Sequence, residues 1–245
     1  MSSSFLPFGS SHGVVILLTL AIPAAALFLS RKGEQREADI AVRLVLGSLL
    51  LLNYFGYAFQ QVLRGAMRWQ EMLPFQLCDW TMVVVLVALL NGGRKRWLEP
   101  AYFWGIGGSL QAIITPNLQV GFPDIRFISF FVDHCGIVIA IVYLMLSRRF
   151  RPGLGSIWRT LLWSEIYLAV TLLVDQITGV NYGFLLHKPE AFSILSYLSN
   201  SRLLYLLQLN LLALVFFAVL YVPFALADLC KGELSPDAGE EERNR

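Results

Sequence analysis

The chain has 245 residues, of which 56% are hydrophobic and only 15% are charged, and its mean hydropathy is +0.61. A soluble core of this length does not need so much apolar sequence, so the composition indicates a polytopic membrane protein. The formal net charge of +2 is too small to indicate that the protein binds nucleic acid. Its three cysteines show no metal-binding spacing, and their odd number argues against a disulfide framework.

The apolar runs predict an all-α fold. They are about as long as the roughly 20 residues that cross a bilayer as a helix, and none alternates with period two as barrel strands do. We therefore predict one domain over residues 1–230 with seven transmembrane helices. The predicted spans are 13–30, 39–63, 75–91, 101–115, 129–147, 157–178 and 203–229. We expect Pro116 to end or kink the short fourth span, and Gly105, Gly107 and Gly108 to let helices approach closely there.

The basic residues predict the orientation of these spans. They cluster in alternate connections, for example at 94–96 and 148–151. By the positive-inside rule this places the N-terminus outside and the C-terminus in the cytoplasm. Residues 231–245 are polar and acidic, which predicts a disordered cytoplasmic tail. No Lys or Arg precedes the first apolar run, so we expect no cleavable signal peptide.

With this orientation, most polar residues of the spans fall in the outer half of the bilayer. A charged side chain in hydrocarbon costs at least about 2.5–3.5 kcal/mol, so an acid there usually faces a protein interior or a water-filled cavity. Because the spans alternate in direction, their outer ends share one level. We expect one polar chamber that opens to the outer leaflet. Its predicted residues are Gln76, Asp79, Gln111, Asn117, Asp133, Asp175, Asn181 and Tyr182.

Cys78 and His134 are the candidate catalytic residues. Helix rise alone places Cys78 about 5 Å and His134 about 8 Å below the outer ends of their spans, so the two side chains can meet. In such a pair the imidazole takes the thiol proton and the thiolate is the nucleophile, which favours acyl transfer through a thioester. We expect Asp79 or Asp175 to orient His134, because Asp133 points about 100° away from its neighbour on a helix.

Three alternatives stay open. In the first alternative, Cys78 is a buried residue that packs as a small apolar side chain, as most free cysteines do. The protein is then a non-catalytic transporter or lipid-binding protein, in which the chamber aspartates carry protons or contact a polar substrate. A third hypothesis is a zinc-dependent seven-helix hydrolase whose ligands are an aspartate with His12, His134 and His187. No two histidines have i,i+4 spacing, so we assign no metal and expect no cofactor. The chain also lacks a Gly-rich phosphate loop and a GxSxG elbow.

Four stretches together are specific enough to indicate a family. They are 73–80 (LPFQLCDW), 102–118 (YFWGIGGSLQAIITPNL), 130–137 (FFVDHCGI) and 181–189 (NYGFLLHKP). On these stretches the chain resembles the YwaF-like family of bacterial integral membrane proteins over nearly its whole length. More distant similarity extends to animal transmembrane protein 164-like lipid acyltransferases, which are thought to use a Cys and a His.

The resemblance implies Cys78 as the acyl acceptor and His134 as the base and then the acid. It implies a multi-pass protein of a bacterial cytoplasmic membrane that acts as an acyltransferase or lipase on membrane phospholipid or lysophospholipid. The ether lipid substrate of the animal enzymes does not carry over. We expect Arg126, Lys188 or Arg202 to contact the lipid phosphate, and the oligomeric state is not implied.

Overall fold

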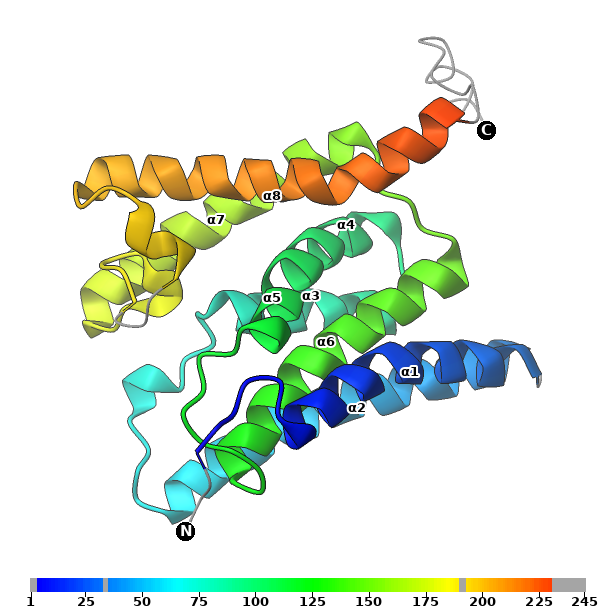
Figure 1. Cartoon of the computed structure of the whole chain (residues 1–245), viewed down its shortest axis with the longest axis horizontal. Helices are drawn as coiled ribbons and strands as arrows, with labels where there is room; N and C mark the ends of the chain where they lie inside the picture. Colours follow the sequence, from blue (N-terminus) through cyan, green and yellow to red (C-terminus); the bar gives the residue numbers. More distant parts are fainter. Residues whose placement is uncertain (1–3, 33–34, 190–192, 231–245) are drawn as a thin grey trace.

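The computed structural model of the chain describes residues 4–32, 35–189 and 193–230, which form an all-α structure (Figure 1). The β pairing within these residues is one isolated bridge between Ser4 and Val120. The all-α prediction is therefore confirmed for the described part of the chain. The tail predicted at 231–245 lies outside it.

Five helices are long and apolar enough, by length and composition, to cross a membrane. They are α1 (Ser10–Lys32), α2 (Gln35–Leu63), α6 (Ile125–Arg148), α7 (Leu154–Thr178) and α8 (Arg202–Cys230). The third predicted span is the shorter apolar helix α3 (Leu77–Leu90). The fourth is a run of α4 (Lys95–Trp104), the π-helix η2 (Gly105–Ser109) and α5 (Leu110–Ile114). Three short 3-10 helices lie in the connections: η1 (Trp69–Glu71), η3 (Tyr182–Phe184) and η4 (Ile194–Tyr197). Five membrane-crossing helices are thus supported, and a count of seven stays a prediction.

The observed helix starts differ from the predicted ones by one to six residues, and two of these differences have a clear local cause. The fourth predicted span begins at Lys95 rather than at 101, because charged residues occupy its first turns and a search for apolar runs passes over them. The fifth begins at Ile125 rather than at 129, because the Asp124 side chain caps it by accepting a hydrogen bond from the backbone N–H of Arg126 at 2.9 Å. The fourth span ends at Ile114, two residues before Pro116, as predicted.

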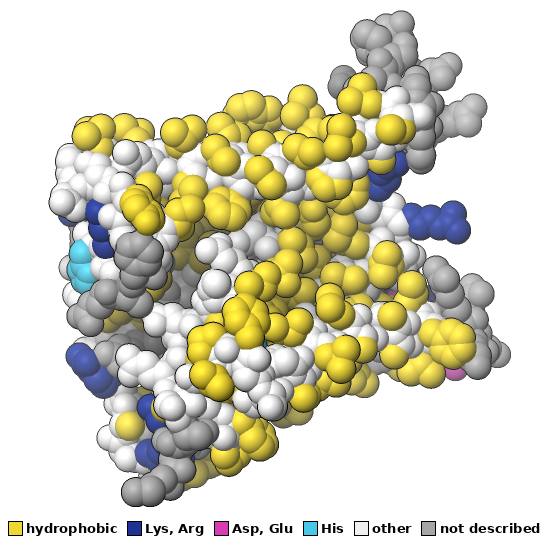
Figure 2. All heavy atoms as spheres, viewed as in Figure 1, with side chains coloured by type: hydrophobic (Ala, Val, Ile, Leu, Met, Phe, Trp, Pro, Cys, Tyr) yellow, Lys and Arg dark blue, Asp and Glu magenta, His cyan; other side chains and the backbone are white. Residues whose placement is uncertain are grey.

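α6 is the central helix. Of the residues in its apolar window 56% are buried, against 22% or fewer in the other four long helices. It packs against α1, α2, α3, α4 and α5. The other long helices turn many large apolar side chains outward, and Figure 2 shows them spread over α8 and α1. A surface of this kind suits lipid contact, because lipid tails are as apolar as the side chains.

The starts of α1, α3 and α6 and the ends of α5 and α7 gather at one end of the molecule. His12 near the start of α1 lies with Nε2 2.7 Å from the carbonyl oxygen of Ile113 near the end of α5. The side-chain oxygen of Gln76, just before α3, accepts a hydrogen bond from the N–H of Gly183, which follows α7, at 3.1 Å. These contacts agree with the expected alternation of helix directions. Which end faces outside stays a prediction.

The opposite end is held by ion pairs between helices. Asp39 of α2 accepts hydrogen bonds from Arg43 Nε at 3.0 Å and from Arg148 Nη2 of α6 at 2.6 Å. Glu99 of α4 is 1% exposed and accepts hydrogen bonds from Arg159 of α7 at 2.6 and 2.7 Å. Each acid joins two helices that are distant in the sequence, so this end is cross-linked by charge.

The close contact of η2 with α6 at Gly105 yields the first prediction. A β-carbon on Gly105 would lie 2.1 Å from the Cδ1 of Ile141 and 3.3 Å from the Cγ2 of Ile137. We expect Gly105→Ala to lower the melting temperature in detergent by several degrees, because overpacking a core typically costs about 1–3 kcal/mol. The control is Gly56→Ala on α2, where no atom lies within 4 Å of the added carbon. Equal melting temperatures for the two variants would contradict the close approach.

Candidate functional site

The start of α3 is fixed by local and distant hydrogen bonds. Asp79 in its first turn accepts a hydrogen bond from the backbone N–H of Gln76 at 2.9 Å, an arrangement that caps the helix. The Gln76 side chain in turn holds the N–H of Gly183. Cys78 stands in this first turn, where the helix dipole favours a negative charge on the side chain. The sequence around Cys78 therefore places the thiol on a rigid helix terminus.

His134 is held in one tautomer by its own helix. Its Nδ1 lies 2.8 Å from the carbonyl oxygen of Phe130, one turn earlier on α6. A carbonyl oxygen only accepts hydrogen bonds, so Nδ1 carries the proton and Nε2 keeps a lone pair. The Phe130 ring also stacks on the imidazole, with ring centroids 4.2 Å apart. Nε2 is therefore oriented to act as a base or as a ligand.

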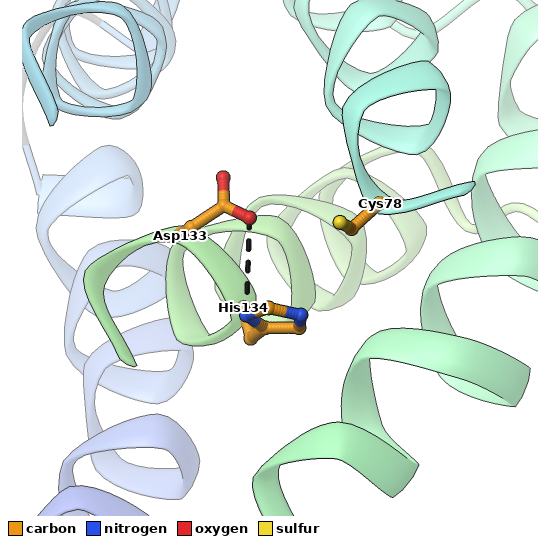
Figure 3. A group of neighbouring side chains, drawn as sticks. All are labelled: Cys78, Asp133 and His134. Atoms are coloured by element: carbon orange, nitrogen blue, oxygen red, sulfur yellow. Dashed lines mark ion pairs between the residues drawn. The ribbon is translucent and has the colours of Figure 1, made fainter. Parts of the chain in front are cut away.

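Three reactive side chains from α3 and α6 converge and are called the Cys78 cluster: Cys78, Asp133 and His134. The sulfur, a carboxylate oxygen and a ring nitrogen lie within 4.8 Å of one another (Figure 3). His134 is the tenth residue of α6, so helix rise places it about 14 Å from the start of that helix rather than 8 Å. α3 has 14 residues, a length of about 21 Å, and is therefore shorter than a hydrocarbon core of about 30 Å.

The carboxylate next to His134 is not the expected one. Asp133 has a carboxylate oxygen 3.8 Å from His134 Nδ1, although we expected it to point away (Figure 3). The 100° rule describes the Cα–Cβ directions, and the side-chain torsions bring the two tips together. Asp79 instead caps α3, and Asp175 accepts a hydrogen bond from the N–H of Tyr182 at 2.9 Å. Neither expected residue orients the histidine.

The polar chamber is divided into two cavities. A larger cavity of about 920 Å³ lies between α5, α7, α8 and the segment after α7, and Gln111 and Asn117 line it. A smaller cavity of about 370 Å³ lies between α2, α6 and the start of α3, and it is lined by Gln76, Asp79 and Asp133. Five of the eight predicted chamber residues are thus divided between two cavities, and a single chamber stays a prediction. Asp133 is the member of the Cys78 cluster that lines the smaller cavity.

Three predicted chamber residues line neither cavity. Asp175 and Tyr182 bond to each other at the end of α7. Asn181 accepts a hydrogen bond from the N–H of Leu186 at 2.9 Å and donates one to the carbonyl oxygen of His187 at 2.8 Å. These residues shape the loop after α7, whose next residues line the larger cavity. Their hydrogen bonds stabilise this loop.

Phe130 and Arg126 are among the residues that line the smaller cavity although sequence reasoning did not assign them to the chamber. Phe130 lines both cavities. Phe130 precedes His134 by four residues, a spacing that places both on one face of a helix and could have indicated the contact. An apolar side chain does not react, so the sequence offered no reason to assign it to the site. Arg126 lines the smaller cavity and pairs with Asp124 at 2.9 and 3.0 Å. Hydrogen bonds from Arg126 lower the pKa of Asp124 to about 2, so this acid stays ionised beside the cavity at neutral pH.

The three-histidine zinc set is not assembled. His12 Nδ1 accepts a hydrogen bond from the N–H of Phe8 at 2.9 Å, so its Nε2 carries the proton and donates to Ile113. His187 lies in the loop after α7, with Nδ1 3.0 Å from the side-chain nitrogen of Asn181. Within the described residues, the metal-ligand types that come together are those of the Cys78 cluster.

Comparison with known families agrees with this architecture. The sequence model of the TMEM164 family matches residues 7–221, which include the whole Cys78 cluster. The chain belongs to the TMEM164 family. Curated proteins and solved structures give no match. For this TMEM164 family member, the family and the five apolar helices support a multi-pass membrane protein. A YwaF-like relationship and acyltransferase chemistry stay predictions.

The three free cysteines of this TMEM164 family member yield the second prediction. Cys78 is half-buried, Cys135 is buried and Cys230 is exposed. If Nε2 of His134 accepts the Cys78 proton, His134→Ala should slow alkylation of Cys78 by iodoacetamide about tenfold or more, because the thiolate is the reactive form. Peptide mass spectrometry measures each cysteine separately, and Cys230 in the same sample is the control. Unchanged Cys78 kinetics would show that the imidazole does not take this proton.

Proposed function

We propose that the protein is a membrane-embedded acyltransferase or lipase that acts on phospholipid through Cys78 and His134. The observation that carries this proposal is the position of a histidine ring nitrogen within 4.8 Å of the thiol sulfur. The Phe130 carbonyl occupies Nδ1, which leaves Nε2 as the base. A thiol beside a free imidazole nitrogen is the minimum set for covalent acyl transfer.

The first half-reaction forms a thioester. His134 Nε2 takes the proton of Cys78, and the thiolate attacks the ester carbonyl carbon of the donor phospholipid. The ester C–O bond then breaks, and the alcohol of the departing lysophospholipid takes the proton from the imidazolium. In the second half-reaction a lysophospholipid hydroxyl gives its proton to His134 and attacks the thioester. The C–S bond breaks, and the thiolate recovers its proton. With water as the acceptor, the same steps release a fatty acid.

Asp133 contributes electrostatically to this cycle. The imidazolium exists only between the two proton transfers, and the Asp133 oxygen 3.8 Å from Nδ1 stabilises its positive charge. The distance is longer than a hydrogen bond, so Asp133 acts through charge while the Phe130 carbonyl orients the ring.

The two cavities suit the two parts of a lipid. The larger cavity has a volume in the usual range for small-molecule sites, and its lining includes Leu77, next to the thiol, and Phe130. An acyl chain placed there ends with its carbonyl beside Cys78. The head group then occupies the smaller cavity, where Arg126 faces the phosphate. Lys188 is a poorer choice, because it lines neither cavity and its ammonium group already donates to the oxygens of Ser196, Leu198 and Asn200.

The proposal includes the expected setting of the site. The proposed partner is a phospholipid or lysophospholipid, and the proposed membrane is a bacterial cytoplasmic membrane. If the chain has seven spans and its N-terminus lies outside, the Cys78 cluster lies towards the outer leaflet. The extra-membrane charge pattern of the sequence supports this direction.

A lipid-binding or transport protein is the second candidate function. Its supporting observation is that Asn53, ten residues before the end of α2, lines the smaller cavity with Asp79 and Asp133. A polar path at that depth suits a bound polar group without covalent chemistry. The two candidates differ in whether the thiol is needed.

The third prediction tests the thiol. We expect Cys78→Ala to abolish acyl transfer from phospholipid to labelled lysophospholipid, and His134→Ala to reduce it by about 10²–10⁴-fold, the usual contribution of general acid–base catalysis. Lipid mass spectrometry measures the product, and intact-protein mass spectrometry should show a hydroxylamine-sensitive acyl adduct on the wild type. Cys230→Ala is the matched control with normal activity. Full lipid binding or transport by Cys78→Ala, with no transferase activity in the wild type, would favour the second candidate.

The fourth prediction tests the larger cavity as the acyl-chain site. A β-carbon on Gly108 has no atom within 4 Å, and Gly108 lines this cavity. Gly108→Phe should therefore fill part of the cavity and shift the preference of the enzyme to shorter acyl chains. The control is Gly56→Phe on α2, which also has open space but lines neither cavity. An unchanged chain-length profile measured with mixed-chain phospholipids would place the acyl chain elsewhere.

A further inference from the structure

We propose that the Cys78 cluster binds a single Zn²⁺ ion, or a similar thiophilic divalent cation. Its three side chains offer sulfur, oxygen and nitrogen ligand atoms within 4.8 Å of one another. Zinc accepts all three ligand types, and three protein ligands with one open position form a common zinc arrangement. The open position faces the smaller cavity, because Asp133 lines it.

The histidine has the outer contact that a metal ligand needs. A metal-binding imidazole usually donates its second N–H to a carbonyl or carboxylate, which fixes the tautomer and directs the free nitrogen at the metal. His134 meets this requirement through the Phe130 carbonyl at 2.8 Å. Stacking against the Phe130 ring holds the imidazole plane. The histidine therefore needs no change of tautomer before it binds a metal ion.

The carboxylate of Asp133 lacks a donor of its own. Among the described residues it receives no hydrogen bond, and its ionic neighbour is His134 Nδ1 at 3.8 Å. Its side chain is only 19% exposed. A carboxylate in such a place is costly unless a cation or a donor satisfies it. A metal ion between Asp133 and the thiol supplies that cation.

Charge and size are both compatible with Zn²⁺. A thiolate and a carboxylate together offset the two positive charges of the ion, so the loaded site is neutral, which suits a low-dielectric membrane interior. Bond lengths of about 2.0–2.3 Å put the ligand atoms of a tetrahedral zinc site about 3.3–3.8 Å apart. The observed limit of 4.8 Å therefore requires an inward movement of about 1 Å, within the reach of side-chain torsions.

Binding of the ion has a consequence for catalysis. Zinc would occupy both the thiolate and the imidazole lone pair that acyl transfer uses, so a loaded site cannot form the thioester. Inhibition by zinc rests on the proposed function, whereas zinc binding does not. The metal site is thus a separate property of the same three side chains.

The fifth prediction uses Co²⁺ as a probe on the full-length protein in detergent after treatment with a chelator. The wild type should bind about one equivalent and show thiolate-to-cobalt charge-transfer absorption in the near ultraviolet, which Zn²⁺ removes by competition. Cys78→Ser should abolish that band, and Asp133→Asn and His134→Gln should each weaken binding by at least about tenfold. Cys230→Ser is the matched control and should bind as the wild type does. An unchanged band in Cys78→Ser would overturn the proposal.

A measurement on the wild type guards against variants that fail to fold. Zn²⁺ should protect Cys78, but not exposed Cys230, from alkylation, as measured by peptide mass spectrometry. Absence of protection at saturating Zn²⁺ would also overturn the proposal. Protection in a protein without transferase activity would leave the metal site standing and remove the proposed function. Inhibition of transfer by Zn²⁺ without protection of Cys78 would remove the metal site and leave the proposed function standing.

Discussion

Polar groups inside a bilayer must find their partners within the protein, because lipid supplies none, and this constraint explains most of the structure. Glu99 and Asp39 receive arginine side chains from other helices. Asp175 and His12 are buried and bond to backbone groups next to other elements. Each of these polar residues joins segments that are far apart in the sequence. The bundle is therefore held by directed polar contacts as well as by apolar packing.

The same constraint singles out the Cys78 cluster. Elsewhere a buried acid has an arginine or a backbone N–H, but Asp133 has neither among the described residues. The lone pair on His134 Nε2 is likewise left free when Phe130 takes the Nδ1 proton. An unsatisfied acid and an unsatisfied nitrogen beside a thiol indicate a place where something else binds or reacts. The surrounding α-helices are rigid, so the cluster is preorganised for it.

The sequence predicts the presence of the helices well and their first residues less well. Apolar runs located all seven helical stretches, because burial in lipid requires continuous apolar sequence. They placed the start of α6 four residues late, because its first turn includes Arg126, and so counted too few residues between that start and His134. They placed the start of α3 two residues early, and Cys78 is the second residue of this helix. The predicted meeting of Cys78 and His134 agrees with the geometry, because each start is in error by about one helical turn or less.

The errors in the site have another origin. The contacts of Asp39 with Arg148 and of Glu99 with Arg159 depend on how helices pack, and no local pattern encodes a contact between residues 109 or 60 positions apart. Asp133 was set aside on backbone direction alone, whereas side-chain torsions decide its contact with His134. Local features fared better. The i,i+4 spacing of Phe130 and His134 is visible in the sequence. It predicts their contact when the backbone carbonyl of Phe130 is considered together with its ring.

Phe130 links recognition of a ligand to the chemistry of the cluster. Its ring lines both cavities and stacks on His134, while its carbonyl determines which imidazole nitrogen is free. A ligand that spans both cavities must contact this ring. Such a ligand therefore contacts the residue that orients the base. Because the backbone of α6 holds the carbonyl in place, the tautomer of His134 does not depend on this contact.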